Sequence, residues 1–536
     1  MAQQHGQGGR GGQGDGRGGH GGRRNPEGPR GSGSRRNPGE LARGNRQRSG
    51  DGQPRGHRQT RGHGQTRTRS RSESVRPRTP REVALTVLRE VETEDAYANL
   101  LLPGRIRNAE MSPRDSSLAT ELTYGTLRMQ GLYDRIVLTA AERDPADLDP
   151  LTRQAVRMGA HQLLGMRVRD HAAVSETVDA LRALGGGRAA GLANALLRRV
   201  SERSREEWLA VLTADVPETE ALSLAHSHPA WIVRALGQAL RGHKRADART
   251  GGLESVLAAD NAPAKVTLAA LPGLADAEEL ALTAGHRGAL SPLAVVLDGG
   301  DPRDVPGVDA ARVRVQDEGS QLIALALAQA SAAEHPRWLD LCAGPGGKTA
   351  VLAALAAQRG GRVEAVDASA HRAELVRDSV RASADVVDIA RADGRAFAAD
   401  RPERFDGVLV DAPCTGLGAL RRRPEARWRR RPEDVAALAE VQLGLLDAAL
   451  TACAPGGVVA YSTCSPHWAE TGSIVDEVLA GRRDAEVLDA AAVLAEVTGA
   501  EADSFASAVR GEGRFVQLWP DVHGTDGMFL ALIRRR

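Results

Sequence analysis

Five short apolar runs alternate with helical patterns in the second half of this 536-residue chain. We expect strands at residues 338–341, 363–366, 387–390, 407–410 and 458–462. Strands that alternate with helices form a parallel, doubly wound sheet covered by helices on both faces. Two later runs, at 514–519 and 528–533, predict a closing pair of strands. The sequence therefore predicts an α/β, Rossmann-like domain over residues 331–536.

A helical pattern occupies residues 81–220. Val83 and Val87 recur at helical spacing, and Ser112 followed by Pro113 predicts an N-cap with proline in the first turn. Further helices are expected over residues 149–164, 171–184 and 188–200. Because no alternating strand pattern interrupts them, we expect an all-α domain.

Shorter patterns lie between these two regions. Residues 221–251 are expected to form a linker. Strand-like runs then follow at 266–270, 294–297 and 312–315, separated by turns rich in Pro, Gly and Asp. We expect a small α+β subdomain over residues 252–330.

The first 80 residues differ from the rest in composition. They contain 18 arginines, no lysine and five acidic residues, a net charge of +13 in a chain whose total is +2. Large apolar side chains are almost absent, so burial cannot offset the entropy lost on ordering, and we expect a disordered tail. An Arg/Gly-rich tail of this kind either contacts nucleic acid or only improves solubility, and composition leaves both interpretations open.

The remaining composition restricts the compartment. No apolar run reaches the roughly 18 residues of a membrane span, and the first residues lack a signal-peptide pattern. Four cysteines without a CxxC pair predict neither a disulfide framework nor a metal site. We expect a protein of the reducing cytoplasm, with each cysteine available for chemistry.

A glycine-rich turn follows the first predicted strand, at residues 340–349 (Asp-Leu-Cys-Ala-Gly-Pro-Gly-Gly-Lys-Thr). A P-loop would need glycine at Cys342, and a dinucleotide fingerprint would need glycine at Thr349. Glycines at such a turn let a ligand approach the backbone at the carboxyl edge of the sheet. The expected cofactor-binding residues of the turn are Cys342, Ala343, Gly344, Pro345, Gly346, Gly347 and Lys348.

Aspartates end the next three strands, at Asp367, Asp393 and Asp411. Asp367 is placed to bind both ribose hydroxyls of an adenosine, and Asp393 to meet the adenine edge. Acidic strand ends without a phosphate-binding signature suit an adenosine that carries no phosphates. We therefore expect S-adenosylmethionine as the cofactor, with these three aspartates among its binding residues.

Two cysteines lie just past adjacent strand ends, Cys414 after Asp411-Ala-Pro and Cys464 within Ser-Thr-Cys-Ser. Cys453, in an apolar helix end, is expected to be a small buried hydrophobe. Polar turns at this sheet edge are where an α/β fold places its chemistry. A redox pair is the alternative, but one nucleophilic thiol with one assistant fits the surroundings better.

These motifs resemble those of the RNA cytosine-5 methyltransferases. The resemblance rests on residues 340–349, 411–416 with the Arg-Arg-Arg-Pro-Glu-Ala-Arg-Trp stretch that ends at Trp428, and 461–465. The helical region resembles the transcription factor NusB. With the motifs at 228–231, 261–263, 316–320 and 524–529, residues 81–536 resemble the bacterial 16S ribosomal RNA methyltransferases of the Sun/Fmu type.

The resemblance implies an activity and a site. Methyl transfer to carbon 5 of a cytosine requires thiolate attack on carbon 6, which makes carbon 5 nucleophilic. In this family the nucleophile is the Thr-Cys-Ser cysteine, here Cys464, and the Pro-Cys cysteine, here Cys414, assists release. Asp411 is placed to act as the acid near N3. We expect a monomer whose partner is 16S rRNA, naked or in an early small-subunit particle. The helical domain, the α+β subdomain and the tail are expected to hold this RNA.

Some positions depart from the family pattern. Thr471 replaces an asparagine, Thr415 replaces a serine, and Ala269-Ala-Leu replaces the Arg-Val-Asn of the family. Two other functions stay open: an RNA-binding assembly or antitermination factor with a vestigial enzyme half, and a methyltransferase acting on tRNA or 23S rRNA. The intact glycine turn and cysteines argue against the first, and the NusB-like region argues against the second.

The charge of the tail generates a prediction. Deleting residues 1–80 should leave the fold intact and weaken RNA binding mainly at low salt, because the deletion removes arginines that release counterions from phosphates. The measurement is the slope of log affinity against log salt concentration for the full-length and truncated proteins. Equal slopes would show that the tail does not touch the RNA.

Overall fold

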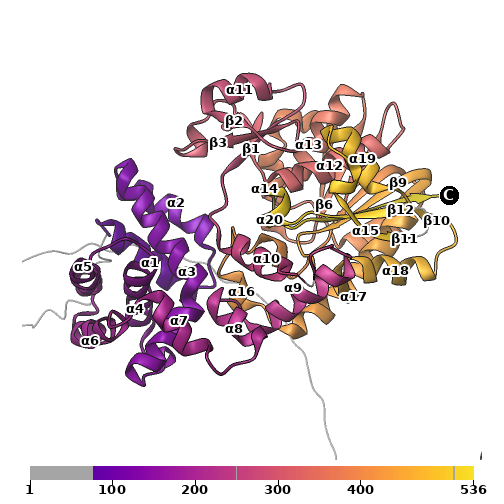
Figure 1. The fold of residues 1–536 in the computed structure, drawn as a ribbon. Helices are drawn as coiled ribbons and strands as arrows, with labels where there is room; N and C mark the ends of the chain where they lie inside the picture. Colours follow the sequence, from indigo (N-terminus) through magenta and orange to yellow (C-terminus); the bar gives the residue numbers. More distant parts are fainter. Residues whose placement is uncertain (1–76, 249, 511–512) are drawn as a thin grey trace, which may run out of the picture. The chain divides into compact units, whose positions relative to one another are not determined.

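A computed structural model describes residues 77–248, 250–510 and 513–536 (Figure 1). The expected disordered tail lies outside these residues, apart from positions 77–80. The described chain contains three groups of elements, which are a helical domain, a small four-stranded sheet and a large nine-stranded sheet.

The large sheet contains all seven strands that the sequence predicts for residues 331–536. Its order is β11-β12-β13-β9-β8-β5-β6-β7, and β10 pairs with β13. The strands are β5 Arg337–Asp340, β6 Arg362–Asp367, β7 Val387–Arg391, β8 Phe405–Asp411, β9 Cys453–Thr463, β10 Ala485–Val487, β11 Ala506–Arg510, β12 Gly513–Gln517 and β13 Phe529–Arg535. Strands β5 to β9 pair in parallel, whereas β10 to β13 are antiparallel. The Rossmann-like prediction is confirmed, in a sheet that is mixed.

Helices cover both faces of this sheet (Figure 1). One face is covered by α12 Glu318–Ala330, α13 Gly347–Gln358, α14 Ala370–Ser379 and α19 Ala490–Thr498, and the other by α15 Gly394–Ala399, α17 Pro432–Ala452 and α18 Gly472–Ala480. Both cores consist mainly of Ala, Leu and Val, as a chain with only 3% aromatic residues requires. Trp338, Phe405 and Phe529 are among the largest fully buried side chains.

Helix α17, Pro432–Ala452, has the length and composition of a membrane span. The sequence had predicted no such span. Its apolar side chains Leu445, Leu446 and Leu450 are buried against the sheet. Among the described residues no other helix passes this test. One side of the helix therefore packs on the sheet.

The small sheet has the order β2-β3-β1-β4, and all its pairs are antiparallel. Its strands are β1 Thr267–Ala270, β2 Gly285–Arg287, β3 Ala294–Leu297 and β4 Val313–Val315, and α11 Ala277–Ala284 packs on them. Strands β1, β3 and β4 coincide with the predicted runs, which confirms the α+β subdomain. The sequence missed β2 because Gly-His-Arg carries no apolar pattern.

Helices fill the segment expected as a linker. Helices α8 Glu218–Ala225 and α9 Ala230–Gly242 precede α10 Gly252–Asn261. Helices α9 and α10 form a core with Leu417, Leu420 and Trp519. The 221–251 segment is therefore packed onto the part of the molecule that contains the large sheet.

The helical domain contains no strand within residues 77–248, as predicted. Its helices are α1 Pro80–Thr93, α2 Ala98–Asn108, α3 Pro113–Ala141, α4 Pro150–Leu164, α5 Asp170–Ala183, α6 Ala190–Val200 and α7 Arg205–Thr213. The Ser112 side chain accepts a hydrogen bond from the Asp115 amide and Pro113 begins α3, which confirms the predicted cap. The sequence missed α2, which contains Pro103.

A buried arginine joins the helical domain to the other half. Arg427, in the short helix α16 Ala426–Arg429, is fully buried. Its guanidinium donates to the Arg128 carbonyl of α3 at 3.2 Å, the Ser227 carbonyl at 3.1 Å, the Asn261 side chain at 2.9 Å and the Asp260 carbonyl at 3.3 Å. Burial lowers the pKa of Arg427 to about 10, so it stays charged at neutral pH. One charged group therefore ties together three separate parts of the chain.

The residues beside Arg427 extend this interface. The Ala98 amide of α2 donates to Glu425 at 3.2 Å. The Trp428 ring fills the space in front of Gly131, where an added Cβ would lie 2.2 Å from it. The 421–430 segment, which begins seven residues after Cys414, thus packs directly on the helical domain.

Removing the guanidinium of Arg427 should destabilise the protein. We expect Arg427→Met to cost about 3 kcal/mol, because buried acceptors lose their only charged donor. The exposed Arg114 provides the control, since Arg114→Met should change stability by less than about 0.5 kcal/mol. Urea unfolding followed by circular dichroism measures both, and an unchanged midpoint for Arg427→Met would contradict the prediction.

Candidate active site

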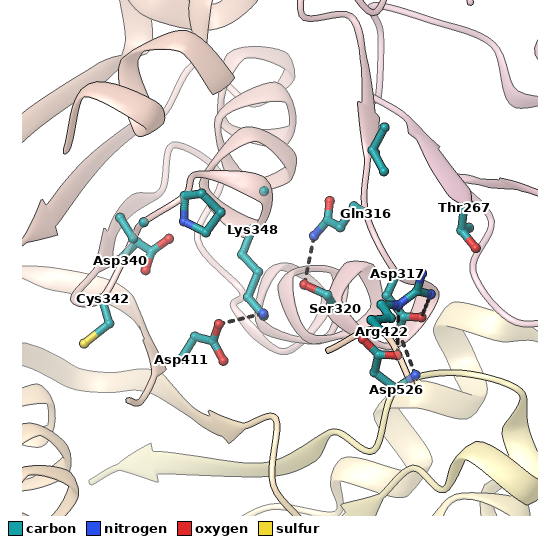
Figure 2. A pocket seen from close by; sticks show the side chains of 15 residues that line it. Thr267, Gln316, Asp317, Ser320, Asp340, Cys342, Lys348, Asp411, Arg422 and Asp526 are labelled. Atoms are coloured by element: carbon teal, nitrogen blue, oxygen red, sulfur yellow. Dashed lines mark hydrogen bonds and ion pairs between the residues drawn. The ribbon is translucent and has the colours of Figure 1, made fainter. Parts of the chain in front are cut away.

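A pocket of about 260 Å³ opens at the carboxyl ends of β5 and β8 (Figure 2). Seven of the ten predicted cofactor-binding residues line it: Cys342, Ala343, Gly344, Pro345, Gly347, Lys348 and Asp411. The other three, Gly346, Asp367 and Asp393, are not among the lining residues. The parallel register explains the meeting point, because Asp340 pairs with Leu409 and Asp411 with Ser462 at one edge of the sheet.

Asp367 holds the glycine turn through a hydrogen bond to its backbone. Its carboxylate accepts from the Gly344 amide at 3.0 Å and from the Ser369 amide at 2.9 Å, and Arg372 pairs with it at 3.3 Å. A Cβ on Gly344 would lie 2.7 Å from this carboxylate, and Gly346 has a φ of +103°. Both positions therefore require glycine, one for space and one for backbone conformation.

Asp393 has local partners at the start of α15. It caps α15 by accepting from the Arg395 amide at 2.9 Å and pairs with the Arg395 side chain at 2.6 Å. The hydrogen bond from the Arg395 side chain lowers the pKa of Asp393 to about 2. Its carboxylate is thus already engaged at the end of β7, outside the pocket lining.

Several lining residues were not assigned from the sequence. Among them, Gln316 donates to Ser320 at 3.1 Å, and its Oε1 is buried without a partner. Asp340 accepts from the Thr349 hydroxyl at 2.7 Å through one oxygen, while its Oδ1 has no partner. Burial raises the pKa of Asp340 to about 7. Two unpartnered acceptors facing a cavity are features of a site that binds a ligand with hydrogen-bond donors.

Lys348 and Asp411 form an ion pair inside the pocket, with Nζ 2.8 Å from Oδ2 (Figure 2). Burial acts to lower the pKa of Lys348, but the attraction of Asp411 outweighs it and the pKa is raised. Lys348 comes from the first turn of α13 and Asp411 from the end of β8. The pair places an ammonium group at the position where the predicted catalytic acid lies.

The two predicted catalytic cysteines lie in contact, with 3.4 Å between their sulfur atoms. Both are free thiols, and the hydrogen bond between them sets their ionisation. The pKa of Cys414 lies well above the usual value and that of Cys464 is lowered, chiefly through the hydrogen bond between the two sulfurs. Lys348 also acts to lower the pKa of Cys464. The directions of these shifts make Cys464 the more readily ionised thiol of the pair.

The other cysteines are inert by comparison. Burial raises the pKa of Cys453 to about 12 and raises that of Cys342 strongly. Cys453 is fully buried, in agreement with its expected role as a small hydrophobe.

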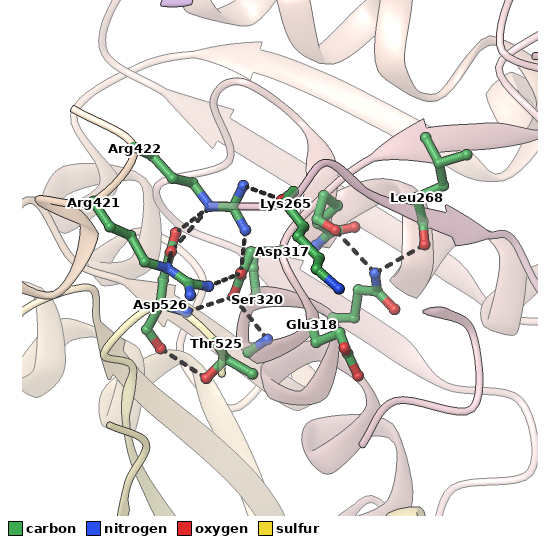
Figure 3. A network of polar contacts seen from close by, with 12 residues as sticks. Lys265, Leu268, Asp317, Glu318, Ser320, Arg421, Arg422, Thr525 and Asp526 are labelled. Carbon is green, nitrogen blue, oxygen red and sulfur yellow. Dashed lines mark hydrogen bonds and ion pairs between the residues drawn. The ribbon is translucent and has the colours of Figure 1, made fainter. Parts of the chain in front are cut away.

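An arginine–aspartate network closes one wall of the pocket (Figure 3). Arg421 and Arg422 both pair with Asp317 and Asp526, at distances from 2.6 to 3.2 Å. The Asp526 amide also donates to Asp317 at 3.0 Å. These residues belong to three of the motifs on which the resemblance to the RNA methyltransferases rests. The network joins the 421–430 segment, the start of α12 and the turn before β13.

Comparison with known proteins identifies the family. The profile of the 16S rRNA methyltransferase RsmB/F family matches residues 325–534, and that of the NusB family matches residues 78–202. The Escherichia coli protein named "Ribosomal RNA small subunit methyltransferase B" is 31% identical over 74% of this chain and 89% of its own length. The chain belongs to the 16S rRNA methyltransferase RsmB/F family.

A second relative and a solved structure are also similar to this chain. A Mycobacterium tuberculosis protein named "Putative methyltransferase Rv1407" is 47% identical over 87% of this chain and 99% of its own length. Among solved structures, the crystal structure of a protein called PH0851 superimposes with a TM-score of 0.69. It shares 22% identity and covers 85% of this chain and 99% of its own, so it supports the fold.

The unequal ionisation of the thiols generates a prediction for this family member. Iodoacetamide should alkylate Cys464 at least about tenfold faster than Cys414 at pH 7, because only the thiolate reacts. Peptide mass mapping after a short exposure of the protein, without RNA or cofactor, locates the modified residue. Faster alkylation of Cys414 would show that the charge lies on the other sulfur.

Proposed function

We propose that this protein methylates carbon 5 of a cytosine in 16S rRNA, with S-adenosylmethionine as the methyl donor and a covalent bond between Cys464 and carbon 6. Membership of the methyltransferase B family supports ribosomal RNA as the substrate. The observation that carries the finer proposal is the pair of cysteine sulfurs, 3.4 Å apart beside the Lys348–Asp411 ion pair.

The pocket fits S-adenosylmethionine by its chemistry. The buried unpartnered oxygens of Asp340 and Gln316 suit the amino and hydroxyl donors of this molecule, and the glycine turn leaves backbone accessible. We propose that Cys342 to Lys348 and Asp411 contact it, that Asp367 contributes at the ribose side and that Asp393 lies toward the adenine. When bound, S-adenosylmethionine supplies a methyl group activated by a sulfonium. These assignments rest on the chemistry of the residues.

Cys464 is the nucleophile in this proposal. Its thiolate adds to carbon 6 of the cytosine, and the electron pair of the ring double bond moves toward carbon 5, which becomes nucleophilic. Lys348 and Asp411 hold a proton between them at 2.8 Å and can share it with N3, which stabilises the adduct. Carbon 5 would then bond to the methyl group as the bond between that group and the sulfonium breaks, leaving a neutral thioether.

Cys414 assists the second half of the reaction. After methylation, a base must take the proton from carbon 5, so that the electron pair of that bond re-forms the ring double bond and expels Cys464 from carbon 6 as a thiolate. Cys414 contacts Cys464 and is close to fully buried. It therefore lies beside the proposed adduct and does not compete with Cys464 for the cytosine. We assign it to product release.

The rest of the chain would hold the RNA. We propose that the helical domain, the small α+β subdomain and the tail orient a 16S rRNA segment, either naked or in an early small-subunit particle. In this proposal the protein acts as a monomer in the cytoplasm.

The two cysteines should give opposite phenotypes when replaced. Cys464→Ala should abolish methylation because the adduct never forms, while S-adenosylmethionine still binds. Cys414→Ala should allow adduct formation and methylation but stall release, so protein and RNA accumulate as a covalent complex. The measurement is a band shift that resists denaturant, with bisulfite sequencing of the RNA to locate the modified cytosine.

The double variant provides the control, because the complex of Cys414→Ala must disappear when Cys464 is also replaced. Trapping by Cys464→Ala with an inactive Cys414→Ala would reverse the two roles, as in cytosine-5 DNA methyltransferases. Methylation that survives both substitutions would contradict the thiol mechanism.

A further inference from the structure

The carboxylate of Glu470 links the two cysteine turns. It lies at the end of a short 3₁₀ helix, Trp468–Glu470, and is fully buried. Oε1 accepts from the Thr415 amide at 2.8 Å, and Oε2 accepts from the Thr415 hydroxyl and from the Ser465 hydroxyl at 2.7 Å. Thr415 follows Cys414 and Ser465 follows Cys464, so one side chain holds the residue after each cysteine.

Hydrogen bonds from further groups fix the Glu470 carboxylate. Its oxygens accept from two N–H groups, of Thr415 and of Gln442, whose side chain lies 3.4 Å away. Within the described residues Glu470 forms no ion pair with a basic side chain. Its position is therefore set by hydrogen bonds to the two cysteine turns and to Gln442.

Glu470 is also among the groups that act on the ionisation of Cys414. Glu470 and Asp411 both raise the pKa of Cys414, after the larger effects of the hydrogen bond to Cys464 and of burial. The charged groups that act on Cys464 are Asp411, Lys348 and Arg423, of which the two cations favour its thiolate. Glu470 therefore opposes a negative charge at Cys414, while the cations attract one to Cys464.

We propose that Glu470 is a positioning residue that holds the two cysteine turns in contact and keeps the shared proton on Cys414. It touches neither substrate nor cofactor and acts through Thr415 and Ser465. This proposal rests on the proposed function, because it explains how one of two adjacent thiols is selected as the nucleophile.

The variant Glu470→Gln removes the charge and keeps the shape. We expect the ratio of Cys464 to Cys414 alkylation by iodoacetamide to fall at least about fivefold, because Cys414 gains a share of the thiolate. We also expect kcat for methyl transfer to fall about tenfold while KM for RNA changes less than about twofold. The exposed Glu477→Gln, on α18, is the matched control and should leave both quantities unchanged.

A second pair of variants tests the hydrogen bonds separately. Thr415→Val removes the hydroxyl that Glu470 holds, whereas Thr415→Ser keeps it. We expect the alkylation ratio to fall with Val and to be recovered with Ser. If Glu470→Gln does not fold, this pair decides the question.

The outcomes are distinguishable. A wild-type alkylation ratio and kcat in Glu470→Gln, or equal ratios for Thr415→Val and Thr415→Ser, would overturn the proposal. The alkylation assay contains neither RNA nor cofactor, so a changed ratio supports the role of Glu470 even if the wild-type enzyme proves to modify another atom. Loss of the proposed function would instead show as the absence of 5-methylcytosine in RNA treated with the wild-type enzyme.

Discussion

The parallel pairing of β8 with β5 on one side and β9 on the other is the constraint on which the site depends. Because parallel strands end at the same edge, this pairing brings Asp340, Asp411 and the Cys464 turn together from positions up to 124 residues apart. The α12 and α17 layers bury both faces of these central strands and fix their register. The ion pair and the sulfur contact follow from that geometry.

Much of the fold could be predicted because apolar periodicity carries it. Every strand expected from an apolar run is present, including those of the small subdomain. The missed strands β2 and β10 are three residues long and β11 is five residues long, and they are held by pairing with neighbouring strands rather than by their own apolar pattern. The packed helix α9 was taken as linker because the Pro229 boundary obscured its pattern.

The site was predicted as far as local motifs reach. The glycine turn and the cysteines are continuous in sequence, and the structure brings them to one pocket. Asp393 lies outside the lining of this pocket, where it caps α15 and pairs with Arg395. Gln316 and Glu470 were not assigned from the sequence, because the pocket that Gln316 lines and the Thr415 contact of Glu470 are formed by distant parts of the chain.

The 421–430 segment has a consequence for how the molecule can be divided. Arg430 donates to the carbonyls of Cys414 and Thr415 at 3.4 and 3.1 Å, while Arg427 holds α3 of the helical domain. The turn that carries Cys414 and the NusB-like region are therefore both contacted by the 421–430 segment. A fragment that retains only the catalytic half would leave a buried cation and the Trp428 ring facing water, and would lose the external anchor of its own catalytic loop. In this family member, the accessory domain is part of the scaffold on which catalysis is built.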